Sequence, residues 1–355
     1  MYENKLNFNF YINQYILQKI SLIDSFKGKW EFIENKKNLF LKELKKITII
    51  ESIGSSTRID GADLANDKIK KLLRNIKNAK FNTKDQQEAI GYYDALINIL
   101  NNFKKINITE NYIKYLHKLL FGKSEKDKKH RGDYKAFSNT DIIKYLDDTE
   151  KITFKTSEPF LVKREMSDLV SSLNKNIKKN KIHPLIITAL FIYEFLSIHP
   201  FQKGNFMLSR LLTTLLLMKS NYHFIQYVSF EQIIEKRKKE YYQALIEGQK
   251  NRNKKNEKID LWILFFLDSL EMLIEKLNIK YKVYTSKGGY LNNRQKTLLV
   301  FIRKNNPVKI HEIDKQFLAI SRNTIKKDLQ YLKHQNYIEQ MGKNKSAVYL
   351  IRDKI

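Results

Sequence analysis

Apolar residues recur at a helical spacing along most of the chain, up to about residue 280. This period of 3.6 residues predicts a mainly helical protein. One break in the pattern lies at 147–160, where Ile152, Thr153 and Phe154 belong to a stretch that alternates between apolar and polar residues. Alternation with a period of two predicts a short β-hairpin or extended flap among the helices.

Two segments near the middle of the chain, 185–198 and 206–218, are apolar on nearly every face. A helix without a polar face belongs in a protein core, so these segments predict two buried helices. The loop between them reads "HPFQKGN" and therefore lies where two core helices meet. We expect the second helix to begin near Asn205, because Asn is a favoured N-cap residue.

The start of this second helix is a candidate phosphate site, since a helix N-terminus offers unpaired N–H groups and the positive end of a dipole. Periodicity alone favours an ordinary helix–loop–helix corner. Two residues favour the phosphate site instead. Arg210 lies in an otherwise apolar helix and needs a carboxylate or an anionic ligand, because an isolated buried charge is strongly unfavourable. His199 begins the loop, where it could act as a general base.

Composition narrows the choice of fold and chemistry. Gly (11) and Pro (4) are scarce among the 355 residues, which disfavours a turn-rich all-β fold. There is no cysteine, so a disulfide framework, a thiolate metal site and a cysteine nucleophile are excluded. No apolar run approaches the roughly 18 residues of a membrane span, and the N-terminus lacks a signal-peptide pattern. We therefore expect a cytoplasmic protein without a membrane partner.

The formal net charge of +28 favours polyanionic partners. A second explanation is a compositional bias, because Lys, Asn and Ile are abundant throughout the chain. Residues 290–355 contain 14 Lys and Arg against 5 Asp and Glu. This part is more densely positive than the rest, so some of the basic character is local.

The C-terminal part reads as a separate unit. Paired glycines and polar residues at 284–290 predict a linker. Beyond it, 291–355 shows three helical patterns and a hairpin pattern, the order of a winged helix-turn-helix. The expected DNA contacts are the polar outer face of the third helix and the hairpin tip, namely Arg322, Asn323, Lys326, Lys327, Lys343 and Lys345. The alternative is a winged helix that contacts only proteins.

The stretch "HPFQKGNFMLSR" resembles the loop of the Fic/Doc (Fido) family, His-Pro-Phe-x-Asp/Glu-Gly-Asn-x-Arg-x-x-Arg. Other segments are similar to the family as well: "YIKYLHKLL" at 112–120, "RGDYKAF" at 131–137 and "RKKEYYQAL" at 237–245. The loop positions that match are His199, Pro200, Phe201, Gly204, Asn205 and Arg210.

The resemblance implies transfer of AMP from ATP to a hydroxyl side chain of a target protein, with the chain itself among the candidate targets. It makes His199 the base, Gly204 and Asn205 part of the phosphate-binding loop, and Arg210 the contact to the distal phosphate. Residue 203 would be a carboxylate that holds Mg²⁺. The hairpin, with Ile152, Thr153 and Phe154, would dock the target.

A second family feature is an inhibitory helix with the pattern Ser/Thr-x-x-x-Glu-Gly. The segment "SSTRIDG" resembles it, with Ser56, Asp60 and Gly61 at the matching positions. In the family this acid pairs with the final arginine of the loop, so the resemblance implies an Asp60–Arg210 pair. The alternative is a plain capped helix turn.

Three departures from the family pattern fall on the site itself. Lys203 replaces the metal-binding carboxylate, and an ammonium group repels Mg²⁺ where a carboxylate attracts it. Phe206 replaces a small residue, and its ring would crowd the site. Met207 replaces the first arginine and removes a charge-assisted contact to phosphate. Lys203 could itself contact the phosphates as a fixed cation.

We therefore expect an all-α fold with a Fic-type helical core and a short hairpin flap. The expected domains are a helical N-terminal region (1–105), the core (106–280), a linker (281–290) and a winged helix (291–355). Two functions remain open. One is an autoinhibited protein adenylyltransferase with an impaired metal site, and the other is a catalytically weak, ATP-binding regulator that acts through DNA. A homodimer is also left open.

Overall fold

The structure is a computed structural model and divides into two compact units, Met1–Leu277 and Asn278–Ile355. It describes residues 6, 10–35, 39–76, 81–124, 126–138, 140–144, 151–254, 256–286, 291, 293–334, 337–342 and 347–352.

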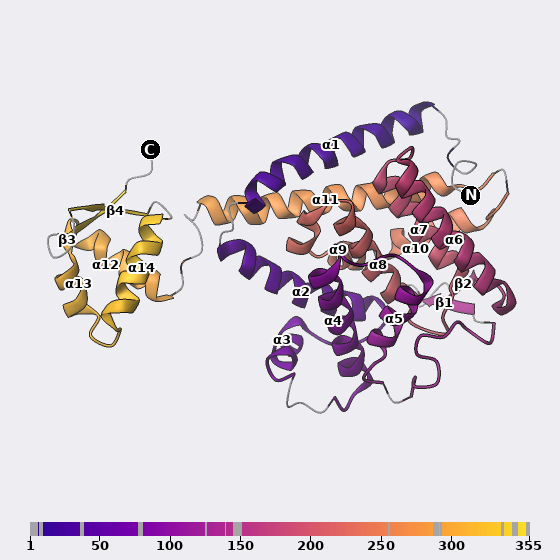
Figure 1. The fold of residues 1–355 in the computed structure, drawn as a ribbon, viewed down its shortest axis with the longest axis horizontal. Coiled ribbons are helices and arrows are strands. Elements are labelled where there is room, and N and C mark those ends of the chain that lie inside the picture. Colours follow the sequence, from indigo (N-terminus) through magenta and orange to yellow (C-terminus); the bar gives the residue numbers. More distant parts are fainter. Residues whose placement is uncertain are drawn as a thin grey trace. The chain divides into compact units, whose positions relative to one another are not determined.

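Helices form nearly all of the first unit (Figure 1). Its elements are α1 (Phe10–Asn35), α2 (Leu39–Ile59), α3 (Asn66–Arg74), α4 (Lys84–Asn102), α5 (Glu110–Leu120), β1 (Thr140–Lys144), β2 (Lys151–Lys155), α6 (Pro159–Lys179), α7 (Pro184–Ile198), α8 (Asn205–Lys219), the 3-10 helix η2 (His223–Tyr227), α9 (Phe230–Lys236), α10 (Lys238–Gln249) and α11 (Ile259–Ser286). The predicted all-α class with a short hairpin is confirmed.

Helices α7 and α8 are the two predicted core helices. Every residue from Leu185 to Ile198 is buried, and so are nearly all residues of α8. Each fully buried Leu, Ile or Phe contributes about 1.5–3 kcal/mol relative to an exposed one, so this pair anchors the unit. The loop 199–204 joins the two helices and is thereby held on a rigid base.

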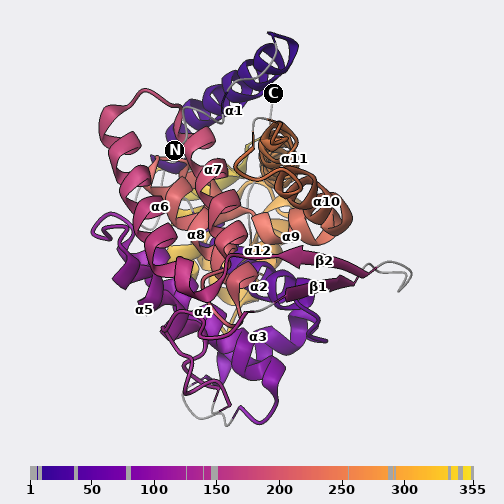
Figure 2. The same cartoon turned by 90° about the vertical axis from the view of Figure 1, so that its right-hand side faces the viewer.

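The two longest helices, α1 and α11, lie side by side in both views (Figures 1 and 2). Their contact includes a buried cation, since the Lys19 ammonium lies 2.6 Å from Asp268 and 2.7 Å from Glu271. Helix α11 continues to Ser286, so it extends into the segment expected to be a linker. The rest of that segment, 287–290, lies outside the described residues.

The predicted flap is an antiparallel hairpin of β1 and β2, which projects from the helices (Figure 2). The strands pair Ile143 with Ile152, Ile142 with Thr153 and Asp141 with Phe154. The first strand thus begins before the alternating stretch that predicted the hairpin, and residues 145–150 lie outside the described part of the chain.

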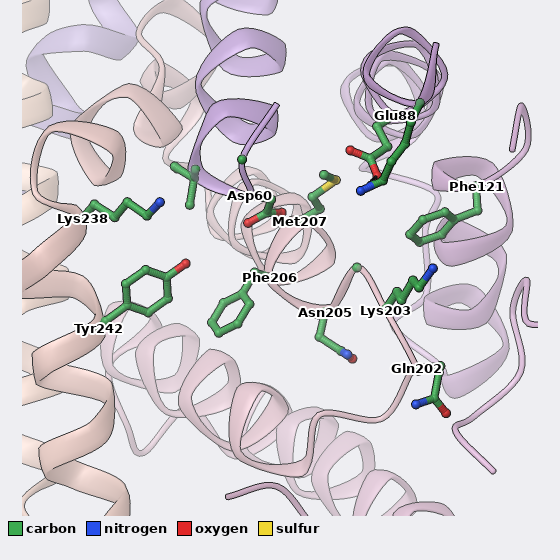
Figure 3. Close-up of a pocket in the computed structure, with 14 residues that line it drawn as sticks. Asp60, Glu88, Phe121, Gln202, Lys203, Asn205, Phe206, Met207, Lys238 and Tyr242 are labelled. Carbon is green, nitrogen blue, oxygen red and sulfur yellow. Dashed lines mark ion pairs between the residues drawn. The ribbon is translucent and has the colours of Figure 1, made fainter. Parts of the chain in front are cut away.

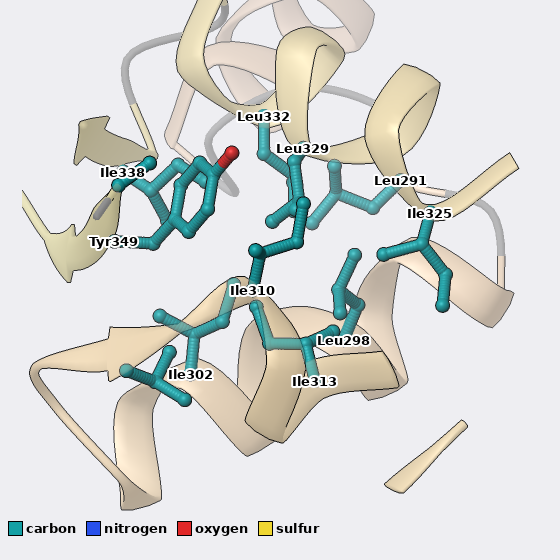
Figure 4. Close-up of a cluster of buried hydrophobic side chains, with 12 residues drawn as sticks. Leu291, Leu298, Ile302, Ile310, Ile313, Ile325, Leu329, Leu332, Ile338 and Tyr349 are labelled. Carbon is teal, nitrogen blue, oxygen red and sulfur yellow. The ribbon is translucent and has the colours of Figure 1, made fainter. Parts of the chain in front are cut away.

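The second unit contains α12 (Asn293–Lys304), α13 (Ile310–Gln316), α14 (Arg322–His334) and a three-stranded antiparallel sheet in the order β3–β5–β4. The strands are β3 (Val308–Lys309), β4 (Ile338–Met341) and β5 (Val348–Ile351). Its own core packs the helices against the sheet (Figure 4) and includes Leu298, Ile302, Ile310, Ile313, Ile325, Leu329, Leu332, Ile338 and Tyr349.

Helix α14 has one buried and one exposed face. Ile325, Leu329 and Leu332 face the core. The outer face exposes Arg322, Asn323, Lys326, Lys327 and Gln330. The two lysines expected at the hairpin tip, Lys343 and Lys345, lie outside the described residues. Within the described part of the chain, no helix combines the length and apolarity needed to cross a bilayer.

Candidate functional site

The loop after α7 is shaped by its own residues. His199 ends α7 in the left-handed region (φ 54°), and its N–H donates to Phe195 O at 2.9 Å. The Asn205 amide closes the loop, because its Oδ1 accepts from Phe201 N at 2.9 Å and its Nδ2 donates to Phe201 O at 2.7 Å. Asn205 is therefore the first residue of α8 and not the expected N-cap.

Gly204 takes the N-cap position with a positive φ of 76°. A Cβ there would lie 2.5 Å from the Phe121 ring, so both the conformation and the space require glycine. Gly204 and Asn205 at the start of α8 line a cavity together with Phe121.

His117 of α5 supports the loop from below. Its ring stacks on Phe201 with a centroid distance of 4.0 Å. Its Nδ1 accepts a hydrogen bond from Gly132 N at 2.9 Å, so Nε2 carries the proton and donates to Lys203 O at 3.1 Å. Burial lowers the pKa of His117 to about 4. These contacts of His117 have no local sequence signal beyond the resemblance of the segment 112–120 to the family.

Lys135 joins the loop to the hairpin. Its N–H donates to Pro200 O at 2.8 Å, and its Nζ donates to Thr156 Oγ1, directly after β2, also at 2.8 Å. The side chain is buried. Through these two hydrogen bonds Lys135 holds the end of the flap against the start of the loop.

A pocket of about 440 Å³ opens at the start of α8 (Figure 3). Helices α2, α4, α8 and α10 and the loop contribute to its wall. The predicted residues Lys203, Gly204, Asn205, Asp60 and Gly61 line it, together with Ile59, Lys84, Glu88, Phe121, Gln202, Phe206, Met207, Lys238 and Tyr242.

Arg210 and Asp60 meet as the sequence suggested. The Arg210 Nη2 lies 2.9 Å from Asp60 Oδ2. Ser56 adds two further acceptors: its Oγ accepts from Nε at 2.9 Å and its carbonyl oxygen from Nη2 at 3.0 Å. The guanidinium is 1% exposed and the carboxylate 20%. Burial, the largest single influence, lowers the pKa of Arg210, but Asp60 and the nearby tyrosines together outweigh it and raise that pKa.

A second ion pair fixes the end of α2. Arg58 Nε donates to Glu235 Oε1 at 2.6 Å and Nη2 donates to Oε2 at 3.0 Å, which makes the contact bidentate. Burial, the largest single influence, raises the Glu235 pKa, but hydrogen bonds from Arg58 and Ser55 and the charges of Arg58 and Lys238 together outweigh it and lower that pKa. Sequence reasoning missed this pair because Glu235 lies on α9, far along the chain. The only signal was a charged residue inside "SSTRIDG".

Phe206 separates His199 from the pocket. Its ring contacts the His199 ring edge-on at 5.5 Å and the Tyr242 ring at 5.4 Å. His199 is 1% exposed and is not among the residues that line the pocket. The structure thus places the predicted base behind an aromatic side chain.

The residues at the implied Mg²⁺ position do not fit this cation. Lys203 presents an ammonium group, which lies 3.1 Å from Asp127 Oδ1, and its side chain is 64% exposed. Of the two acids in the pocket, Asp60 pairs with Arg210, and Glu88 lies 3.3 Å from Lys84. The described residues contain no group of three or more His, Asp and Glu side chains that could hold a metal ion.

Comparison with known proteins found similarity in both sequence and fold. Residues 107–217 match the Fic/DOC family. A Fic family protein from Desulfovibrio desulfuricans is similar in structure, with a TM-score of 0.65, 19% identity and 96% coverage of each chain. Residues 107–217, which include the loop between α7 and α8, thus resemble the Fic/DOC family, and the chain shares its fold with this solved structure.

Two further solved structures share the fold. One is a Fic domain containing signaling protein from Bacteroides thetaiotaomicron, with a TM-score of 0.58, 20% identity, and coverage of 72% of this chain and 96% of that one. The other is residues 134–508 of Fic-1 from C. elegans, with a TM-score of 0.61, 18% identity, and coverage of 77% and 74%.

The depressed pKa of His117 predicts a pH dependence of stability. The folded chain keeps the ring neutral down to about pH 4, whereas the unfolded chain protonates it near pH 6.5. The free energy of unfolding should therefore fall as the pH drops from 6.5 to 4, by about 3 kcal/mol at most. Urea unfolding across this range measures it.

His117→Gln should be less stable at pH 7 and should lose this part of the pH dependence. The exposed His130 provides the control, since His130→Gln should leave the profile unchanged. An unaltered slope in His117→Gln would show that the proton binds elsewhere.

Proposed function

We propose that the pocket at the start of α8 binds ATP, and that AMP transfer to a protein hydroxyl is autoinhibited and weak. One observation carries this proposal. Arg210 is a buried cation whose acidic partner, Asp60, also lines the pocket. A terminal phosphate could replace the carboxylate as the partner of Arg210 without leaving a buried charge unpaired.

The proposed transfer step uses His199 as its base. A target hydroxyl, presented along β2 near Ile152, Thr153 and Phe154, loses its proton to His199 and attacks the α-phosphorus. A new O–P bond forms, the bond to the β-phosphate oxygen breaks, and pyrophosphate leaves. A base must come within hydrogen-bond distance of the hydroxyl, and the Phe206 ring over His199 opposes this approach.

The same nucleotide pocket also supports the second hypothesis, a nucleotide-binding regulator that acts through DNA. The DNA contact would come from the second unit. The polar outer face of α14 is what a recognition helix presents to DNA, with Asn323 suited to base edges and lysines to phosphates. We propose that the second unit is a winged helix that binds DNA. In this hypothesis the Fic domain senses nucleotide, and the second unit carries the output.

Replacing Asp60 tests the exchange of partners at Arg210. Asp60→Ala should lower the free energy of unfolding without ligand by roughly 3 kcal/mol, at the low end for a buried pair because the carboxylate is partly exposed. ATP affinity should rise, on the order of tenfold. Thermal shifts with and without ATP measure both effects.

The exposed Asp63 supplies the matched control, and Asp63→Ala should change neither quantity. Arg210→Ala in the Asp60→Ala background should abolish the gain in affinity. Weaker ATP binding by Asp60→Ala would contradict the proposal.

Restoring the family residues tests why transfer is weak. The triple variant Lys203→Asp, Phe206→Gly and Met207→Arg should raise incorporation of AMP into protein in the presence of Mg²⁺, on the order of a hundredfold. Mass spectrometry of the chain after incubation with labelled ATP measures the product. Adding His199→Ala should remove the gain. If the triple variant gains nothing, the loss of activity lies outside these three positions.

DNA binding by the full chain should weaken steeply with salt, because lysines that contact phosphates release counterions. Lys326→Gln with Lys327→Gln should reduce the salt slope by about 2, roughly one unit for each phosphate contact. The exposed Lys304 on α12 is the control. Fluorescence anisotropy with a duplex measures these slopes, and no binding at low salt would favour the protein-contact hypothesis.

A further inference from the structure

Three lysines from different elements line the pocket: Lys84 of α4, Lys203 of the loop and Lys238 of α10. Two of them have acidic partners nearby. Lys84 lies 3.3 Å from Glu88, and Lys203 lies 3.1 Å from Asp127. Lys238 differs from both, because its side chain makes no hydrogen bond or ion pair with any other described residue.

Lys238 is also the least solvated of the three. Its side chain is partly buried, and it extends beside Tyr242 towards Asp60 (Figure 3). Burial lowers its pKa, while Asp60 partly opposes this effect. Lysine normally keeps its ammonium group in water. A partly buried ammonium directed into a pocket without a hydrogen-bond partner is suited to an anionic ligand.

The position of Lys238 also fits the departures in the loop. Met207 lines the pocket but lacks the positive charge of the family arginine that it replaces. Lys203 lines it where the family has the carboxylate that binds the metal. Cations from α4 and α10 remain to neutralise an anion. A polyphosphate carries several charges along its length, and separate point charges on flexible stems can each contact a different phosphate.

We propose that Lys238, assisted by Lys84 and Lys203, forms a metal-independent contact site for the polyphosphate of a nucleotide. This inference rests on the proposed nucleotide-binding function. It adds that the pocket binds ATP that is not complexed with Mg²⁺. Lys238 is the main contact because no hydrogen bond or ion pair has to be broken before it binds phosphate. Lys84 and Lys203 must first separate from Glu88 and Asp127.

The test is calorimetry of ATP with the full chain in EDTA. Lys238→Gln should weaken ATP binding on the order of tenfold to hundredfold, the loss expected for one charge-assisted contact. AMP binding should change much less, because AMP lacks the distal phosphates. The control is Lys236→Gln, which removes the same charge from an exposed position at the end of α9 and should leave ATP binding unchanged.

A second comparison separates direct contact from an effect through Asp60. In the Asp60→Ala background, Lys238→Gln should again weaken ATP binding by a similar factor. If its effect disappears there, Lys238 acts only as a partner for Asp60 and the inference is overturned. Unchanged ATP binding by Lys238→Gln would overturn it as well. Failure of the unmodified chain to bind ATP would instead overturn the proposed function.

Discussion

A guanidinium group in the middle of a hydrocarbon core must have a counter-charge, and the arrangement of the first unit follows from this requirement. Arg210 lies on α8, one of the two core helices, and its partners Ser56 and Asp60 lie on or just after α2. The end of α2 is therefore held against the core by its bonds to Arg210, whose buried charge would be strongly unfavourable without them. The pair Arg58–Glu235 holds the same end from the other side.

The candidate site combines a rigid loop with a replaceable ion pair. His117, Lys135 and Asn205 hold the loop through its backbone, so the start of α8 is arranged before any ligand arrives. Such preorganisation avoids the cost of ordering the loop on binding. Asp60, by contrast, is partly exposed and sits at the edge of the pocket. The loop backbone is thus fixed, and within the ion pair the side chain that must move, Asp60, is the more exposed of the two.

Much of this could be predicted from the sequence because the decisive signals are local. The fully apolar segments predicted α7 and α8, and the alternating stretch predicted the hairpin. The charge of Arg210 in an apolar helix predicted a carboxylate or an anionic ligand beside it, and the family resemblance implied Asp60. The rest depends on contacts between distant segments. Neither the Arg58–Glu235 pair nor the proton position on His117 has a local pattern. Asn205 was expected at the N-cap because propensity does not show that its amide closes the loop with Phe201.

The two bonds made by Lys135 have a mechanical consequence. The same buried residue holds Pro200 at the start of the loop through its main chain and Thr156 at the end of the hairpin through its ammonium group. A force that tilts the hairpin at Thr156 is therefore transmitted through one side chain, over a few ångströms, to the backbone beside His199. The positions of the hairpin and the loop are therefore mechanically coupled, and a large displacement of one strains the hydrogen bonds that Lys135 makes to the other.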